Sequence, residues 1–587
     1  MTTTEFPSDT QPFPSAEAPA AHIPLGDESE TWFKSYDPGL PHSLQPYPEQ
    51  TLLDIVHETV AQRPEHTALI FKGKHMTYAE LEQLSNAFAA ALVALGVKKG
   101  DRVALMLPNS PQFAIAQLGV WKAGGIACPI NSLYTERELE HVLNECGTET
   151  VIVLTPYYSK VKSVQKSTPV KRVIASNIKE FLPAHLRILF TLAKEKKGGH
   201  RIELKTGDKH MHDLLRQHAG ATQPGVEVAP RDPAIIFFSG GTTGAPKAVL
   251  GTHEAIVMTA MQLHVYAKSI LEDWKDVLVW FMPAFHIYGN MALCTPLLAH
   301  WPIAIIPDPR DLDDLIDTIQ KIRPAILHGV PTLFNALINR PDVQSGKVDI
   351  KSMKICYSAA APLMAETKHR FEALTGGRLL EAYAMTETMM AAVACPVHGV
   401  YKEGSTGLPL PDVLVRIVDL ETGQHVIPSN EIGEIIVRAP QIMLGYWGRP
   451  DETANIIKNG WVYTGDIGYL DEDGYLFIVD RKKDLIKPSG FQVWPREVEE
   501  VIATHPAVAD VSVAGVLDAV QGEAVKAWIV VKPGQTLDVE DIRTYCRGKL
   551  TAYKIPKYIE FRESLPKSMV GKTLRRALLA EEKVNKE

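Results

Sequence analysis

Strand-like and helix-like segments alternate along this chain from residue 51 to beyond residue 380. Residues 67–71 and 102–107 predict short apolar strands, and residues 77–95 predict a helix that ends near Gly96. Parallel strands need helical crossovers, so this alternation favours an α/β architecture with largely parallel sheets. The pattern therefore predicts that most of the chain folds as an α/β domain.

The pattern changes at three places, which predict the domain organisation. Residues 1–30 are rich in Pro, Ala, Ser and Thr without periodicity, and predict a disordered tail. Between about 406 and 480, short strands separated by turn signals predict a β-rich subdomain of the large domain, which spans 31–480. Residues 481–587 are long enough to form a small α+β domain of their own.

Charge and cysteine usage exclude several classes of protein. The formal net charge is −8, which argues against nucleic acid as the main partner, because phosphate-backbone binding needs a basic surface. The six cysteines include no CxxC pair, so neither a zinc site nor a disulfide scaffold is indicated. The N-terminus has no secretory pattern, and no apolar run reaches the ~20 residues that span a bilayer. These features predict a cytoplasmic enzyme.

A glycine- and threonine-rich segment follows the apolar run 234–238 and predicts a phosphate-binding loop. Glycines let backbone N–H groups turn inward, threonine hydroxyls add donors, and lysine supplies positive charge. A Walker A loop is excluded, because Pro246 and Ala248 flank the lysine. The alternative is a solvated turn, but the specific order of the nine residues 239–247 disfavours it. The predicted phosphate-binding residues are Ser239, Gly240, Gly241, Thr242, Thr243, Gly244 and Lys247.

Four further segments are ambiguous when each is taken alone. Thr386 and Glu387 resemble a helix cap, and the Thr-Gly-Asp run at 464–466 resembles a turn. The small-residue run at 358–363 and the basic segment at 566–576 are equally unspecific by themselves. They become informative as a set, because they follow the glycine-rich loop in a fixed order along the chain.

In that order the five segments resemble the motifs of the adenylate-forming superfamily, which contains acyl-CoA synthetases, firefly-type luciferases and the adenylation domains of peptide synthetases. The similarity runs from about residue 50 to 580. It implies two doubly wound α/β subdomains and a β-barrel-like subdomain in the large domain, followed by a small mobile domain. It also implies ATP, Mg²⁺ and coenzyme A as cofactors or cosubstrates.

The resemblance assigns a role to each motif. Thr386 contacts phosphate and Glu387 holds the metal. A carboxylate supplies the hard oxygen ligand that suits a Mg²⁺ ion bound to ATP phosphates. Lys572 is catalytic, because a positioned ammonium stabilises charge that develops on the α-phosphate. The remaining nucleotide-binding residues that it implies are Ala360, Ala361, Pro362, Tyr383, Asp466 and Arg481. Alanines at 248, 359, 360 and 384 replace glycines that are usual in the family.

Residues 480–492 are similar to the family hinge that joins the two domains. The similarity implies that Lys483 absorbs a large backbone rotation, so that adenylate formation and thioester formation use opposite faces of the small domain. A charged linker is the alternative interpretation. The segment is predicted to support the thioester step through Lys487, Gly490, Phe491 and Gln492.

The identity of the acid is predicted from weaker features. Residues 283–289 resemble the aromatic gate beside the acyl pocket, where His286 replaces the aspartate of amino-acid-activating members and is predicted to be catalytic. Residues 131–140 resemble bacterial long-chain fatty acid–CoA ligases. Within an insertion-like region at 156–225, residues 181–197 form an apolar helix with a basic end, suited to an anionic membrane surface. The alternative is an ordinary packed helix.

The sequence thus predicts a medium- or long-chain fatty acid–CoA ligase. Alternatives are an aryl or 4-coumarate-type CoA ligase, an enzyme that loads a carrier protein with the acyl-adenylate, and a pseudo-enzyme that binds nucleotide or fatty acid. The expected partners are a carboxylate, ATP and CoA, with possible membrane contact at 181–197. The sequence does not determine the oligomeric state.

Overall fold

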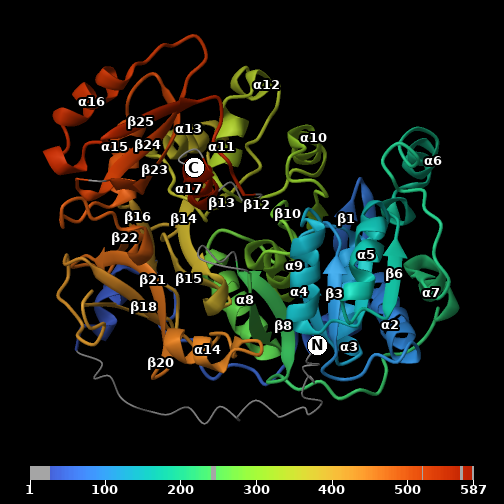
Figure 1. Cartoon of the computed structure of the whole chain (residues 1–587). Coiled ribbons are helices and arrows are strands. Elements are labelled where there is room, and N and C mark those ends of the chain that lie inside the picture. The colour runs from blue at the N-terminus through green and yellow to red at the C-terminus, as the bar shows by residue number, and fades with distance from the viewer. Residues whose placement is uncertain (1–26, 240–245, 519, 569–572, 585–587) are drawn as a thin grey trace, which may run out of the picture.

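The computed structural model describes residues 27–239, 246–518, 520–568 and 573–584. Three β-sheets organise these residues, two in the large N-terminal part and one near the C-terminus (Figure 1). The predicted fold class is confirmed: helices and strands alternate, and a large N-terminal domain is followed by a small C-terminal one.

The largest sheet is parallel in its middle and antiparallel at its ends. The parallel strands are β14, β13, β12, β10, β11 and β1. At one end β2 pairs antiparallel to β1, and at the other end β15 pairs antiparallel to β14. In spatial order its strands are β17 (Leu414–Val418), β18 (Gly433–Arg438), β21 (Trp461–Leu470), β22 (Leu476–Arg481), β16 (Ser405–Pro409), β15 (Met390–Ala394), β14 (Arg378–Met385), β13 (Ile355–Ser358), β12 (Ile326–Gly329), β10 (Leu278–Trp280), β11 (Ile303–Ile305), β1 (Thr67–Phe71) and β2 (Lys74–Thr77), with β20 (Ile457–Lys458) beside β21.

The second sheet is doubly wound, and the strands at one of its edges pair in antiparallel fashion. Its central strands are buried apolar runs, as expected for parallel strands that are covered on both faces. The spatial order is β19 (Gly445–Tyr446), β9 (Lys247–Thr252), β8 (Pro233–Ser239), β4 (Ile126–Pro129), β3 (Arg102–Met106), β5 (Thr150–Leu154), β6 (Arg172–Ser176) and β7 (Lys209–His210).

Helices α2, α3, α8 and α9 contribute to one apolar core that both sheets share. The ring of Phe113 in α3, for example, meets Trp280 of β10 at 5.7 Å between ring centroids. The helices of the large domain are α1 (Leu52–Gln62), α2 (Tyr78–Ala94), α3 (Pro111–Lys122), α4 (Glu136–Cys146), α5 (Tyr158–Val164), α6 (Ala184–Ala193), α7 (Met211–Gln217), α8 (His253–Ala267), α9 (Ile287–Ala299), α10 (Leu312–Ile322), α11 (Pro331–Ile338), α12 (Pro341–Gln344), α13 (Ala365–Thr375) and α14 (Pro450–Ile456).

The predicted β-rich region continues from the largest sheet. Strands β17, β18, β21 and β22 lie between 406 and 480, where the sequence predicts short strands. The N-terminal segment, which begins with η1 (Asp27–Ser35), packs against this region although it is distant in sequence. Trp32, for example, shares one buried apolar cluster with Leu408 of β16 and Tyr475.

The small domain contains the third sheet, formed by β23 (Val508–Asp518), β24 (Gly522–Val531) and β25 (Tyr558–Arg562). Its helices are α15 (Pro495–Ala503), α16 (Val539–Arg547) and α17 (Arg575–Val584), and the short turn η6 (Lys482–Asp484) leads into it from β22. Among the described residues, none of the helices combines the length and the apolar character that crossing a membrane requires.

Candidate active site

Three of the predicted motifs begin where strands of the large domain end. Ser239 ends β8, Ser358 ends β13 and Met385 ends β14, so the glycine-rich, alanine-rich and Thr-Glu segments each follow the carboxyl end of a strand. In open α/β sheets this edge is where ligands bind. Ser239 pairs with Lys247 across the β8–β9 hairpin, which brings both ends of the phosphate-binding segment together. Gly240, Gly241, Thr242, Thr243, Gly244 and Lys572 lie outside the described residues.

One cluster joins Tyr383, Asp466 and Arg481. The Tyr383 hydroxyl donates to Asp466 Oδ2 at 2.7 Å, and Arg481 Nε lies 3.2 Å from Asp466 Oδ1. Asp466 and Arg481 are cross-strand partners on β21 and β22, and Tyr383 comes from β14. Burial raises the pKa of the Tyr383 phenol, with a further rise from Asp466, so the phenol is a proton donor at neutral pH.

A second cluster surrounds Glu387, which is 9% exposed. Its Oε1 accepts a hydrogen bond of 2.9 Å from Tyr446, and burial raises the pKa of its carboxyl group. The ammonium of Lys247 lies 4.8 Å from the centroid of the Tyr446 ring and pairs with Glu452 at 2.6 Å. The cluster thus places Lys247, at the end of the phosphate-binding segment, close to a buried carboxyl group.

The Glu387 cluster fits a magnesium ion that comes with a nucleotide. Among the described residues, no group of three or more His, Cys, Asp and Glu side chains could hold a metal. Mg²⁺ commonly takes one or two carboxylates and fills its other positions with phosphate oxygens and water. A carboxyl group whose pKa is raised by burial would be ionised by such a cation, because opposite charge favours the charged form.

The turn after β14 carries Thr386 and Glu387 and ends in two residues with a strained backbone. It is a short 3₁₀ turn, η5 (Thr386–Thr388), followed by Met389 and Met390 with φ angles of 52° and 99°. Non-glycine residues in this region cost free energy and persist where the surrounding structure fixes them. The Thr388 hydroxyl stabilises the turn by donating to the carbonyls of Met385 and Met390.

The alanine-rich loop after β13 has a strained residue and a buried support. Ala360 has a φ angle of 73°, while Ala361 is half-buried and Pro362 is exposed. Glu381 lies beneath the loop, where its Oε2 accepts from the backbone N–H of Leu363 at 3.4 Å. Burial raises the pKa of Glu381 to about 7. Glu381 was missed in the sequence, where it appears as an ordinary carboxylate two residues before Tyr383.

The predicted gate segment is fixed by hydrogen bonds and ring contacts. His286 caps the N-terminus of α9, with its Nδ1 accepting from the backbone N–H of Tyr288 at 3.2 Å. The Tyr288 hydroxyl donates to the carbonyl of Tyr357, and its ring stacks on His328 at 5.5 Å. Tyr288 thereby connects the gate to β12 and β13. The catalytic role of His286 stays a prediction.

The predicted CoA-binding segment lies on the small domain. The backbone N–H of Lys487 donates to Glu523, and the Phe491 ring, 55% exposed, stacks on Tyr553 at 4.7 Å. Gly490 has a φ angle of 87°, and the Lys487 and Gln492 side chains are exposed. These contacts are all within the small domain, so the segment is available at the surface in this orientation.

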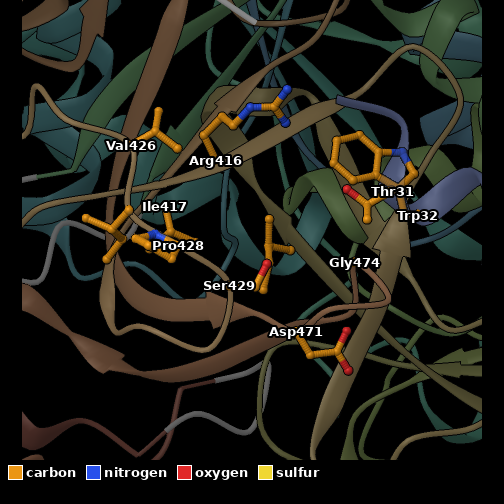
Figure 2. Close-up of a pocket in the computed structure, with 11 residues that line it drawn as sticks. Thr31, Trp32, Arg416, Ile417, Val426, Pro428, Ser429, Asp471 and Gly474 are labelled. Carbon is orange, nitrogen blue, oxygen red and sulfur yellow. The ribbon is translucent and has the colours of Figure 1, made fainter. Parts of the chain in front are cut away.

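A separate recess lies between the N-terminal segment and the β-rich strands (Figure 2). Its lining includes Trp32, Pro428 and Gly474, and the Arg416 guanidinium lies 5.6 Å from the centroid of the Trp32 ring. The recess encloses about 20 Å³, enough for one water molecule and far too little for a nucleotide. None of the described site residues lines it.

Two family models match the chain. Residues 56–447 match the AMP-binding enzyme family, and residues 497–572 match the AMP-binding enzyme C-terminal domain. Among individual proteins, a long-chain-fatty-acid–CoA ligase of Bacillus subtilis is 38% identical over 559 residues, which cover 94% of this chain and 98% of that protein. A long-chain-fatty-acid–CoA ligase of Escherichia coli O6:H1 is 37% identical over 557 residues, with the same two coverages.

Solved structures agree with this similarity. ATP-bound MatB from Rhodopseudomonas palustris is 29% identical with a TM-score of 0.80, and the match covers 91% of this chain and 99% of that one. A fatty acyl CoA synthetase of Mycobacterium tuberculosis is 26% identical with a TM-score of 0.69, and the match again covers 91% and 99% of the two chains.

Proposed function

This chain belongs to the AMP-binding enzyme family, and from that premise we propose that it ligates a long-chain fatty acid to coenzyme A at the expense of ATP. The observation that carries the proposal is similarity over nearly the whole chain to long-chain-fatty-acid–CoA ligases, at 36–38% identity. The clusters around Asp466 and Glu387 supply the polar groups that such a reaction needs.

In the first step a carboxylate oxygen attacks the α-phosphorus of ATP, the bond to the bridging oxygen breaks, and pyrophosphate leaves. Asp466 and Arg481 would hold the ribose, and the loop at 359–362 would lie against the adenine. Lys247 and Thr386 would bind the leaving phosphates, and Lys572 would stabilise charge on the α-phosphate. Positioning of this kind supplies most of the catalysis in phosphoryl-type transfers.

Glu387 would hold the Mg²⁺ that accompanies ATP, an ion that neutralises charge on the phosphates when it is bound. The protein's part is to fix the carboxylate. The Tyr446 hydroxyl and the strained turn at 386–390 restrict where Glu387 can point. Outer contacts of this type tune metal affinity in other proteins.

In the second step the sulfur of CoA attacks the acyl carbonyl carbon, the bond to the AMP oxygen breaks, and the thiol proton is lost to solvent. We assign the approach of CoA to Lys487, Gly490, Phe491 and Gln492, and the change of orientation to a rotation at Lys483. The proposed large domain is 31–480 and the small domain 481–587, after a tail at 1–30.

We also propose a cytoplasmic enzyme that touches membranes through α6. No residue of this helix is buried, and Ile188, Leu189 and Leu192 are 61%, 58% and 80% exposed. Figure 1 shows α6 projecting from the edge of the molecule. Arg187 within the helix and Lys194, Lys196 and Lys197 after its C-terminal end are exposed, and their positive charge favours an anionic lipid surface.

The function is tested by measuring pyrophosphate release over a panel of carboxylic acids, each with and without CoA. We expect turnover to peak on long-chain acids and to require CoA. A peak on cinnamate-like acids would replace the proposal with an aryl-CoA ligase, and adenylate without thioester would indicate a carrier-protein partner. Absence of pyrophosphate release with every acid would refute ligase activity.

A further inference from the structure

The small domain is held to the large domain by a polar contact centred on Asp480, the residue next to the end of β22. The Asp480 side chain is 3% exposed. It lies 3.3 Å from Arg575 Nη1, and it accepts a hydrogen bond of 2.6 Å from the backbone N–H of Arg496. The Arg496 guanidinium adds a bond of 2.8 Å to the carbonyl of Ile478 on β22.

Arg575 is surrounded by three carboxylates. Besides Asp480, it contacts Asp484 at 3.0 Å and Glu499 at 2.8 Å. Its side chain is 22% exposed, so the contact is largely withdrawn from water. Glu499 is itself fixed to the small domain, because it accepts from the backbone N–H of Val513 at 2.7 Å.

These contacts lie on both sides of the proposed hinge. Asp480 and Ile478 precede Lys483 in the chain, whereas Arg496, Glu499 and Arg575 follow it. A rotation at Lys483 would carry Glu499 and Arg575 along together but would separate Arg575 from Asp480. The Arg575–Asp480 pair therefore distinguishes this orientation from any strongly rotated one.

The contacts of Asp480 and Arg575 lie next to groups that the proposed function assigns to the first half-reaction. Arg575 is three residues after Lys572, and Asp480 is adjacent to Arg481, which contacts Asp466 at 3.2 Å. The pair thus joins the end of the lysine segment to the nucleotide cluster. Phe491, assigned to the CoA step, is meanwhile 55% exposed and contacts Tyr553 of its own domain.

We propose that Arg575 is a positioning residue whose ion pair with Asp480 holds the small domain in the adenylating orientation and must open before the thioester forms. The inference rests on the proposed two-step function. An ion pair suits this task, because it fixes one geometry while it is closed. When it opens, water can hydrate both charged groups, and no apolar surface is exposed. A population shift between two orientations then sets the relative rates of the half-reactions.

The test separates the half-reactions. Adenylation is measured as acid-dependent exchange of pyrophosphate into ATP without CoA, and thioester formation is measured from synthetic acyl-AMP and CoA. We expect Arg575→Gln and Asp480→Asn each to slow adenylation on the order of tenfold, while thioester formation is unchanged or faster. Arg575→Lys, which keeps the charge, should recover part of the adenylation rate.

Arg562→Gln is the matched control. Arg562 pairs with Glu560 and Glu581, both within the small domain, so its loss should leave the ratio of the half-reactions unchanged. If the Arg575 and Asp480 variants slow both half-reactions by one factor, slow thioester formation more, or change neither, the inference is overturned. If the wild-type protein forms neither adenylate nor thioester, the proposed function fails instead.

Discussion

Around the site, residues with a strained backbone lie close in sequence to buried carboxyl groups. Ala360, Met389 and Met390 all have positive φ angles, and they follow β13 and β14, the strands that lead into the site. Glu381 and Glu387 are buried carboxyl groups with raised pKa values on or directly after β14. Strain and perturbed ionisation of this kind concentrate at functional sites, and both are open to measurement.

Replacing Ala360 with glycine is expected to stabilise the protein. At a φ angle of 73° an alanine side chain is disfavoured, and glycine removes this penalty at a smaller cost in unfolded-state entropy. We expect a gain of about 0.5–1 kcal/mol in the unfolding transition of the large domain. Ala361→Gly is the control, because Ala361 has no positive φ angle and should lose stability. Equal destabilisation by both changes would contradict the strain at Ala360.

Glu381→Gln is expected to change how stability depends on pH. Burial raises the pKa of Glu381 from 4.5 to about 7, so the folded protein binds a proton that the unfolded chain releases. The stability linked to this proton is fully present below pH 4.5 and is lost as pH rises through about 7. At pH 8 the variant should gain roughly 2–3 kcal/mol relative to wild type, and at pH 4.5 almost none. Denaturant unfolding at both values, with exposed Glu203→Gln as control, measures the difference.

At the scale of elements, α6 is an apolar helix that lies exposed at the surface. It has apolar residues at the spacing of a packed helix, yet none of them is buried. The sequence left a packed helix and a membrane-facing helix open, and the exposure of Ile188 and Leu192 favours the second. Nothing in the described fold covers this face.

The α6 proposal predicts binding to anionic vesicles. Ile188→Ser/Leu192→Ser should lower partition onto phosphatidylserine-containing vesicles by a factor on the order of 10²–10⁴, because each of the two buried aliphatic side chains contributes about 1.5–3 kcal/mol. Val400→Ser/Val520→Ser removes two exposed aliphatic residues elsewhere and should have little effect. Co-sedimentation measures both. Equal binding of the two variants and of the wild-type protein would refute a role for α6.

Much of the fold could be predicted from local pattern. Turn signals and buried apolar runs predicted the strands at 67–71 and 234–238 and the four strands of the β-rich region. The contacts between motifs could not be predicted, because they join residues far apart in sequence, as Tyr383 and Asp466 do at a separation of 83 residues. Glu381 was missed, and Arg575 was recognised only as part of the 566–576 motif, because charged side chains look solvated until burial and partners are known.

At the scale of the whole molecule, the proposed site would be shared by two domains. Tyr383 and Asp466 lie in the proposed large domain, whereas Arg481, Lys572 and the predicted CoA-binding segment lie in the proposed small one. The contacts that Asp480 and Ile478 make with Arg496 and Arg575 are polar, and we propose that the Asp480–Arg575 pair holds the present orientation. Such an interface is consistent with domain rotation between steps.

Lys572→Ala is expected to divide the two half-reactions. In the proposed mechanism the lysine would stabilise charge during attack on the α-phosphate and would have no task in thioester formation. The variant should therefore lose adenylation by a factor on the order of 10²–10³ yet retain thioester formation from supplied acyl-AMP. Rapid-quench assays of each half-reaction measure this. Equal loss of both activities would show that the assigned division of labour is wrong.

The central claim is that the acid is activated as an acyl-adenylate, and isotope transfer tests it most directly. A long-chain fatty acid labelled with ¹⁸O in its carboxylate is incubated with ATP, Mg²⁺ and CoA, and the masses of the products are measured by mass spectrometry. If a carboxylate oxygen attacks the α-phosphorus, each AMP formed with acyl-CoA carries one ¹⁸O atom. Unlabelled AMP, or label in inorganic phosphate with ADP as the nucleotide product, would contradict the account.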